Sequence, residues 1–360
     1  MLKRIQFLLT PVLLGLGFAF IYIVLVSPEL LPKQLSSKQT PANASHLSFA
    51  NAVQAASPAV VNIYSESISN RPRSLRPQIA RELGSGIIMS KKGYILTNYH
   101  VINNADQILV VLNDGRQFTD VQIIGYDEIT DLALLKINAD HLPEIPTDDN
   151  YVAQVGDIVL AIGNPLNIGQ SITQGIISAT NKSNLTQKRR LKLLQMDAAV
   201  NRGNSGGALV NTNGILVGIP SLAFKPSADS EAQGIFFATP YPLAKQVMES
   251  IIKDGRVIRG YIGFNAEPVD SSGRMIRSNY TPVYGVRISS LDPLGPAWRA
   301  GFEHGDIVVK INNEKATNID KMLTLISHSA PQSELNFTLV RNGEVLNKTV
   351  VVADLNDAPR

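Results

Sequence analysis

Short aliphatic runs separated by turn residues fill the chain from Gly84 to about Ile219, and this pattern restricts the folds open to it. The runs lie at 86–89, 94–97, 107–112, 157–162 and 215–219. Two turns, Asn-Asp-Gly-Arg at 113–116 and Asn-Thr-Asn-Gly at 211–214, are typical of β-hairpins. Because helical stretches are few in this region, the pattern favours an antiparallel barrel or sandwich over alternating strand and helix units.

The segments on either side of this region have different patterns. Residues 49–56 and 57–64 suggest a short helix that leads into a strand. Residues 65–81 are polar, basic and proline-bearing, which is typical of a mobile loop. The clearest helix covers 241–252, where apolar side chains recur at a period near 3.6 residues and Gly255 follows the last turn.

A second unit of about 95 residues follows Arg259, and this is the size of a small independent domain. Strands are expected at 285–288, 306–311, 334–340 and 348–352, with one helix at 318–327. The sequence therefore predicts two folded parts after the N-terminal region.

The N-terminal residues predict a membrane anchor. Residues 5–26 carry no charged side chain, and a helix of this length is about 33 Å long, enough to cross a bilayer. Lys3 and Arg4 precede it and predict a cytoplasmic tail at 1–4. A cleaved signal peptide is the alternative, but its apolar core is normally shorter, and 27–32 offer no small-x-small cleavage site. Residues 27–45 have the composition of a linker to a body outside the cytoplasm.

The sequence Gly-Asn-Ser-Gly-Gly at 203–207 places a serine hydroxyl between glycines. A backbone that bends sharply and aims amide groups at a developing oxyanion has little room for side chains. Gly203, Asn204 and Ser205 are therefore candidates for an oxyanion hole made of backbone amides. A serine alone is a weak nucleophile and needs a base, and the same five residues also fit a tight hairpin without chemistry.

His100 supplies a candidate base and Asp131 a candidate carboxylate. Imidazole can accept the seryl proton near neutral pH and return it to a leaving amine. A carboxylate fixes the imidazole tautomer and stabilises the imidazolium. Each residue alone also fits a structural role, and Asp120 and Asp127 are rival carboxylates.

The chain order decides between two enzyme folds. His100 precedes Asp131, which precedes Ser205, as in chymotrypsin-like proteases. Gly-x-Ser-x-Gly also matches the nucleophile elbow of α/β-hydrolases, but there the acid and the histidine follow the serine. Downstream of Ser205 the only histidines are His304 and His328, both in the second unit. The order favours a catalytic triad of the chymotrypsin type.

Composition excludes several other classes. The net charge of +3 is too small to indicate a nucleic acid partner. The chain has no cysteine, which rules out disulfides and thiolate chemistry. We expect no metal and no cofactor, and we assign no role to the remaining histidines, which are His46, His141, His304 and His328.

The blocks around His100, Asp131 and Ser205 resemble the three signature blocks of the HtrA serine proteases. The resemblance covers the chain from about residue 46 to 355. The resemblance implies a mainly β fold, with a chymotrypsin-like double β-barrel protease domain at 46–255 and a small α+β PDZ domain at 256–355. One PDZ domain after an N-terminal transmembrane helix narrows the resemblance to the DegS branch. Gly-Arg-Val-Ile-Arg-Gly-Tyr-Ile-Gly at the domain junction strengthens it.

Members of the DegS branch are trimers anchored in the inner membrane of Gram-negative bacteria. The resemblance implies a homotrimer with a cytoplasmic N-terminus and periplasmic protease and PDZ domains. It also implies cleavage of a membrane-bound anti-sigma factor, which starts the sigma-E envelope stress response. Activation would come from C-terminal peptides of misfolded outer-membrane proteins. Two alternatives stay open: an anchored PDZ peptide sensor with an inactive protease fold, and a general periplasmic quality-control protease.

The resemblance also assigns residues to peptide binding and regulation. Four residues resemble the loop with which PDZ domains capture a terminal carboxylate, namely Tyr261, Ile262, Gly263 and Phe264. Met322 would line the side-chain pocket, and a turn that feeds a core strand is the alternative. Family members usually carry Gly-Arg in a regulatory loop where this chain has Asn181-Lys182. Lys182 keeps the charge of arginine but lacks its planar bidentate fork.

The last prediction from the sequence concerns the residue before the scissile bond, P1. Ala199 stands six residues before Ser205, where chymotrypsin-like proteases place the floor of the specificity pocket, and Ile219 and Ser221 are further candidates for its lining. Because no carboxylate is present to attract Lys or Arg, we expect a small or medium aliphatic P1 residue. A peptide library varied at P1 measures this, and a preference for basic residues would contradict it.

Overall fold

A computed structural model describes residues 11, 14–19, 21–22, 48–69, 78–164, 169–182, 191–222, 234–269, 277–278, 281–282, 285–316 and 318–358. The chain divides into two units, Met1–Ser48 and Phe49–Arg360. In the first unit the described residues up to 22 are helical and exposed. No helix within the described ranges is long and apolar enough to cross a membrane. The predicted anchor at 5–26 falls mostly outside those ranges and stays a prediction.

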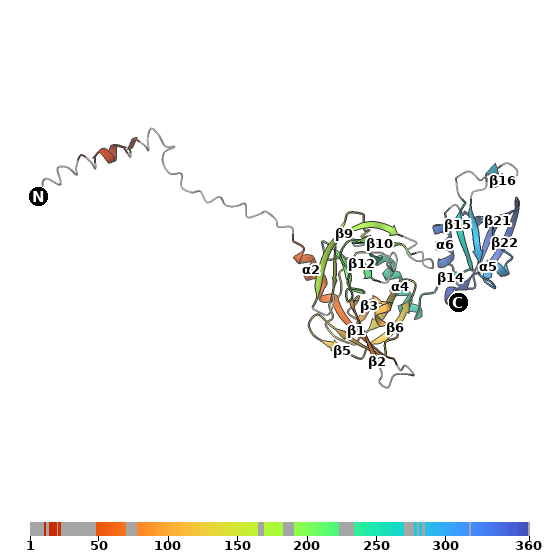
Figure 1. The fold of residues 1–360 in the computed structure, drawn as a ribbon, viewed down its shortest axis with the longest axis horizontal. Helices are drawn as coiled ribbons and strands as arrows, with labels where there is room; N and C mark the ends of the chain where they lie inside the picture. Colours follow the sequence, from red (N-terminus) through yellow and green to blue (C-terminus); the bar gives the residue numbers. More distant parts are fainter. Residues whose placement is uncertain are drawn as a thin grey trace. The chain divides into compact units, whose positions relative to one another are not determined.

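The second unit begins with a seven-stranded antiparallel sheet in the order β5-β4-β1-β2-β3-β7-β6. Strands β1, β2, β3, β5 and β6 of this sheet are labelled in Figure 1. As the sequence predicts, a helix and a 3-10 turn, α2 (Ala50–Ala56) and η2 (Ser57–Ala59), lead into the first strand. A short helix, α3 (Tyr99–Ile102), follows the third strand. The strands are β1 (Val60–Ser69), β2 (Gln78–Ile88), β3 (Tyr94–Asn98), β4 (Gln107–Val111), β5 (Gln117–Phe118), β6 (Gln122–Asp127) and β7 (Leu132–Lys136).

Strands β1 and β2 extend into the segment that the sequence predicts to be a loop. They stay paired to their ends, with Ser69 opposite Gln78 and Glu66 opposite Arg81. The loop prediction for 65–81 is therefore wrong at both ends of that range, and residues 70–77 lie outside the described part of the chain. Cross-strand pairing overrides the polar composition there, and it includes an ion pair of 2.8 Å between Arg81 Nε and Glu66 Oε1.

A closed six-stranded barrel follows, in the order β10-β13-β12-β11-β8-β9. Its strands are β8 (Ile158–Gly163), β9 (Ser171–Lys182), β10 (Leu193–Met196), β11 (Ala208–Asn211), β12 (Leu216–Ser221) and β13 (Phe236–Pro240). The predicted helix at 241–252 is present as α4 (Tyr241–Asp254), and Gly255 ends it in the left-handed conformation at φ 72°. A residue with a Cβ would be strained there.

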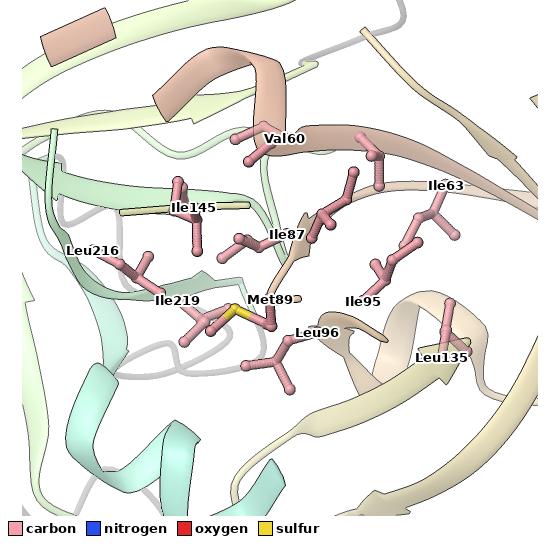
Figure 2. Packing of buried hydrophobic residues seen from close by; sticks show 14 of the residues in the cluster. Val60, Ile63, Ile87, Met89, Ile95, Leu96, Leu135, Ile145, Leu216 and Ile219 are labelled. Carbon is pink, nitrogen blue, oxygen red and sulfur yellow. The ribbon is translucent and has the colours of Figure 1, made fainter. Parts of the chain in front are cut away.

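The largest hydrophobic cluster joins the sheet to the barrel (Figure 2). It contains Ile63, Ile87 and Leu135 of the sheet together with Leu216 and Ile219 of β12. Along β8 and β11, alternate side chains face this cluster and a second one inside the barrel, because successive residues of a strand point to opposite faces. Burial of apolar surface on both faces of these strands therefore stabilises the docking of the two halves.

The last part of the chain, from Gly260 onward, has its own hydrophobic core. A two-stranded sheet pairs β14 (Gly260–Tyr261) with β23 (Ala353–Asp354). The main sheet has the order β15-β18-β19-β21-β22, with β20 (Glu314–Lys315) beside β19. Its strands are β15 (Phe264–Pro268), β18 (Val286–Leu291), β19 (Ile307–Ile311), β21 (Glu334–Arg341) and β22 (Glu344–Val351). The other elements here are β16 (Arg277–Ser278), β17 (Thr281–Pro282), α5 (Pro296–Arg299), α6 (Ile319–His328) and η4 (Leu355–Asp357).

Candidate active site

His100 and Asp131 come together because β3 and β7 are neighbours. Asn98 at the end of β3 pairs with Leu132 at the start of β7. The residues just beyond this pair, on α3 and in the turn before β7, must then lie side by side. His100 and Asp131 are 31 positions apart in the sequence, and the antiparallel pairing of β3 with β7 brings them together.

The Asp131 carboxylate receives two hydrogen bonds from His100. The backbone amide of His100 donates to Oδ1 over 3.0 Å, and ring atom Nδ1 lies 2.7 Å from Oδ2. A carboxylate only accepts, so Nδ1 carries the hydrogen and Nε2 keeps a free lone pair. The ring is thus oriented as a general base.

The backbone of Asp131 is held in an uncommon conformation, with φ at 55°. Its carbonyl accepts hydrogen bonds from the Tyr99 amide over 3.0 Å and from Asn98 Nδ2 over 2.8 Å. Aspartate tolerates the left-handed region better than most residues, although at some energetic cost. These two bonds offset that cost and aim the carboxylate at His100.

Ser221 supplies a third hydrogen bond to the same carboxylate. Its hydroxyl donates to Asp131 Oδ2 over 2.6 Å, and both side chains are buried. A buried charge is costly unless it is hydrogen-bonded, and bonds to charged groups are stronger than neutral ones. Since Ser221 ends β12, the barrel contributes directly to holding the acid of the sheet.

Ser205 lies next to this group of residues. Its Oγ accepts a hydrogen bond of 3.2 Å from the amide of Leu222, the residue after Ser221. Hydrogen bonds therefore connect Ser205 to the amide of Leu222, and the neighbouring Ser221 to Asp131. Asp131 in turn is bonded to His100. All three residues predicted for the triad are in one site.

The predicted oxyanion residues form a tight turn before Ser205. The Asn204 amide donates to the Asn201 carbonyl over 3.0 Å, and Gly203, the third residue of the turn, has a φ of 106°. These features define a type II turn, which needs glycine at this position. Because the turn uses the Asn204 N–H, the prediction of this amide as an oxyanion donor is wrong, and the amides of Gly203 and Ser205 are the remaining candidates. The Asn204 side chain is buried, and within the described residues both of its amide atoms have no hydrogen-bond partner. An unpaired buried amide costs about 1–3 kcal/mol, so this turn must be held by its surroundings.

The residues predicted for the specificity pocket have different surroundings. Ala199 is half-buried, and its carbonyl accepts a hydrogen bond from Thr173 Oγ1 over 2.8 Å. Ile219 has no exposed surface and packs with Leu216 and Met89 in the joining cluster (Figure 2). Its contribution to a pocket would therefore come from its backbone. Ser221 is engaged with Asp131, and the pocket itself stays a prediction.

Asp127, the rival carboxylate, has a different role. Arg259 binds it through two hydrogen bonds of 2.6 and 2.8 Å, and the Thr130 amide and hydroxyl also donate to it. Burial opposes ionisation of this carboxyl, but the bonds and charge of Arg259 and the bonds from Thr130 outweigh it, so the pKa of Asp127 lies below its usual range. The pair ties the segment after α4 to the turn that carries Asp131.

The residues predicted to bind a peptide carboxylate form the loop between β14 and β15. Tyr261 ends β14, Phe264 starts β15, and Gly263 between them has a φ of 80°. The Tyr261 hydroxyl donates to Asp292 Oδ2, and burial and this bond raise the pKa of Tyr261. Ile262 and Met322 are buried in the core below the loop.

Lys182 is the last residue of β9, and its side chain lies outside the described residues, as do residues 183–190. Its predicted regulatory role stays a prediction. Within the described ranges, no group of three His, Cys, Asp or Glu side chains could hold a metal ion.

Comparison with known proteins matches this geometry. A family model for a trypsin-like peptidase domain matches residues 84–219, and one for a PDZ domain matches residues 260–352. The serine endoprotease DegS of Haemophilus influenzae is 44% identical over 310 residues, which are 86% of this chain and 88% of the relative. DegS of Escherichia coli K12 is 41% identical over 358 residues, 96% of this chain and 98% of the relative. The chain belongs to the DegS branch of the HtrA serine endoproteases.

Solved structures of serine proteases also match. A serine endoprotease from Yersinia pestis aligns with a TM-score of 0.69 at 44% identity, over 86% of this chain and 98% of that one. The HtrA-type protease AlgW with a decapeptide aligns with a TM-score of 0.76 at 36% identity, over 87% and 100% of the two chains.

This geometry predicts a chemical role for each residue. We expect Ser205 Oγ to attack the scissile carbonyl while His100 Nε2 takes its proton, and His100 then to return a proton to the leaving amine. Asp131 should stabilise the imidazolium that forms between these steps. The amides of Gly203 and Ser205 should stabilise the oxyanion of the tetrahedral intermediate.

Replacement of Ser221 tests its bond to Asp131. Ser221→Ala removes one of three donors to a buried carboxylate, and such bonds contribute about 1.5–3 kcal/mol. We expect kcat to fall about tenfold or more with KM nearly unchanged, because the loss concerns the transition state. Steady-state kinetics on a peptide substrate measures this. Unchanged kcat in a folded variant would contradict it.

Replacement of Arg259 tests the pair with Asp127. Arg259→Gln leaves a buried carboxylate without its cation, and we expect the free energy of unfolding at pH 7 to fall by about 2 kcal/mol. Because the pKa of Asp127 is depressed by folding, its contribution is present above the unfolded pKa of about 3.9 and is lost as pH falls through the folded pKa. The difference between variant and wild type should therefore shrink below about pH 4.

Urea unfolding followed by circular dichroism from pH 3 to 7 measures this difference. The exposed pair of Arg81 and Glu66 supplies the control, because Arg81→Gln should cost at most about 1 kcal/mol at any of these pH values. An Arg259→Gln penalty that does not change with pH would show that the charge of Asp127 is not its cause.

Proposed function

We propose that this HtrA protease is an inner-membrane protein whose periplasmic domains cleave a membrane-bound anti-sigma factor when C-terminal peptides of misfolded outer-membrane proteins bind its PDZ domain. The observation that carries the proposal is the orientation of the backbone amides in the loop at 261–264. The trimeric state is part of the proposal and rests on the family.

Two amides of this loop are directed toward an open strand edge. The carbonyls of Ile262 and Gly263 accept hydrogen bonds from the amides of Ala297 and Asp292, over 2.7 and 2.9 Å. In a trans peptide the N–H points opposite to the C=O, and the described residues contain no cis bond. The amides of Gly263 and Phe264 therefore point away from Ala297 and Asp292. Two adjacent amides of this kind can bind a terminal carboxylate.

The strand after the loop can receive the rest of a peptide. In the described part of the sheet, β15 is the end strand, and it pairs on one side with β18. A peptide can add to the other side as a further strand. The HtrA-type protease AlgW has been solved with a tripeptide and with a decapeptide, which supports binding of a peptide by this chain.

The anchor supports the location of the enzyme. An uncharged segment at 5–26 preceded by Lys3 and Arg4 would place everything after it on the far side of the inner membrane. A membrane-bound substrate would then lie in the same plane as the protease. The second candidate, a general periplasmic quality-control protease, would need neither the anchor nor a dependence on peptide.

The proposal is tested with the full chain in lipid vesicles. A decapeptide with the C-terminal residues of a porin should raise cleavage of the periplasmic part of an anti-sigma factor by about 5- to 150-fold, the usual range of coupling between two sites. The same peptide with an amidated C-terminus should not, because its carboxylate is missing. Initial rates of product formation measure both.

Other outcomes separate the alternatives. Equal cleavage with and without peptide, and of unfolded proteins in general, would favour the quality-control protease. Peptide binding without any cleavage would favour an inactive sensor. Cleavage that survives Ser205→Ala would show that the measured activity belongs to a contaminant.

A further inference from the structure

Ser85 of β2 is a buried residue that the catalytic scheme does not use. Its side chain has no exposed surface. The Ser85 hydroxyl donates to the carbonyl of Gly203 over 2.7 Å and accepts from the amide of Asn164 over 3.1 Å. Its backbone amide donates to the carbonyl of Ser205 over 2.9 Å. One residue of the sheet thus contacts the nucleophile and the turn before it, both of which belong to the barrel half.

The two bonds restrict the peptide units on both sides of the Ser205 amide. The carbonyl of Gly203 belongs to the peptide unit that joins Gly203 to Asn204. The carbonyl of Ser205 belongs to the peptide unit that joins Ser205 to Gly206. With both fixed, the unit between them, which carries the Ser205 N–H, has little freedom to rotate. This N–H is one of the two donors expected in the oxyanion hole.

The backbone on the other side of Ser205 is closely packed against its neighbours. A Cβ on Gly206, whose φ is 82°, would lie 2.3 Å from the Ser85 carbonyl oxygen. A Cβ on Gly207 would lie 2.3 Å from the Ile162 carbonyl and 3.2 Å from Ser85 Cβ. Gly206 is therefore required by the close approach of β2, and Gly207 mainly by that of β8.

A second contact between β2 and the turn is weaker. Arg202 Nη2 donates to the Arg81 carbonyl over 3.2 Å and to Glu82 Oε2 over 2.8 Å. The side chains of Arg202 and Glu82 are 61% and 54% exposed. Exposed ion pairs contribute little, whereas a buried hydroxyl bond cannot be replaced by water. Among these anchors, the Ser85 hydroxyl is the decisive side chain.

We infer that Ser85 is a positioning residue of the oxyanion hole, which acts through the carbonyl of Gly203 and not on the substrate. Its hydroxyl holds the type II turn against the cost of the unpaired Asn204 amide. The inference concerns the endopeptidase chemistry and is independent of the proposed regulation by peptides.

The test removes the hydroxyl in the full-length enzyme. For Ser85→Ala we expect kcat to fall about 10- to 100-fold, less than the factor of about 10²–10³ for direct loss of an oxyanion donor. KM should change less than about twofold, because the hole binds the transition state and not the substrate. A fluorogenic peptide with the P1 residue preferred in the library serves as substrate.

A transition-state analogue distinguishes positioning from general damage. A peptidyl boronic acid forms a tetrahedral adduct with Ser205, so its Ki should rise in Ser85→Ala by the same factor by which kcat/KM falls. Binding of the intact peptide should be equal in Ser205→Ala with and without Ser85→Ala. Ser65→Ala is the matched control, since Ser65 of β1 is also buried and donates to a backbone carbonyl, that of Val101, over 2.6 Å.

The inference is overturned if Ser85→Ala keeps wild-type kcat, if the Ki of the boronic acid does not change, or if Ser65→Ala loses as much activity. Should Ser85→Ala fail to fold, Ser85→Cys carries the test, because a thiol keeps the shape but is a weak donor. Its kcat should then lie clearly below that of wild type, and a kcat equal to wild type would overturn the inference.

Discussion

The buried charge of Asp131 is the constraint on which the rest of the site depends. A carboxylate in the interior must be surrounded by hydrogen-bond donors, and here they come from both halves of the protease. His100 on α3 supplies its amide and ring nitrogen, and Ser221 at the end of β12 supplies its hydroxyl. Satisfying one charge therefore requires that the sheet and the barrel dock in a single way.

Packing and polar contacts agree on that arrangement. The alternation of side chains along β8 and β11 supplies apolar surface to the joining cluster and to the interior of the barrel at the same time. The hydrogen bonds of Ser85 cross the same junction a short distance from the nucleophile. Non-directional burial brings the halves together, and directional bonds then set the register needed for catalysis.

Local patterns in the sequence predicted some of the strands, α4 and α6, and they singled out His100, Asp131 and Ser205, which the structure brings into one site, because residue type and spacing carry this information. The same patterns could not predict the contacts of Ser221 with Asp131, of Ser85 with Gly203, or of Arg259 with Asp127. These partners are 90, 118 and 132 positions apart, and a short polar side chain has no periodic signal of its own. The error at 65–81 has a related cause, since the polar ends of β1 and β2 are strands only because they pair with each other.

The position of the site between two halves has a consequence for how the enzyme loses activity. Each half has its own hydrogen-bonded sheet, whereas the nucleophile of the barrel half is aligned with the base and acid of the sheet only across the junction. A perturbation that loosens the junction by a small distance would stop cleavage while the secondary structure of both halves is intact. Proteolysis is thus confined to the fully assembled fold, and partly folded chains of this protease would be unable to attack one another or their neighbours.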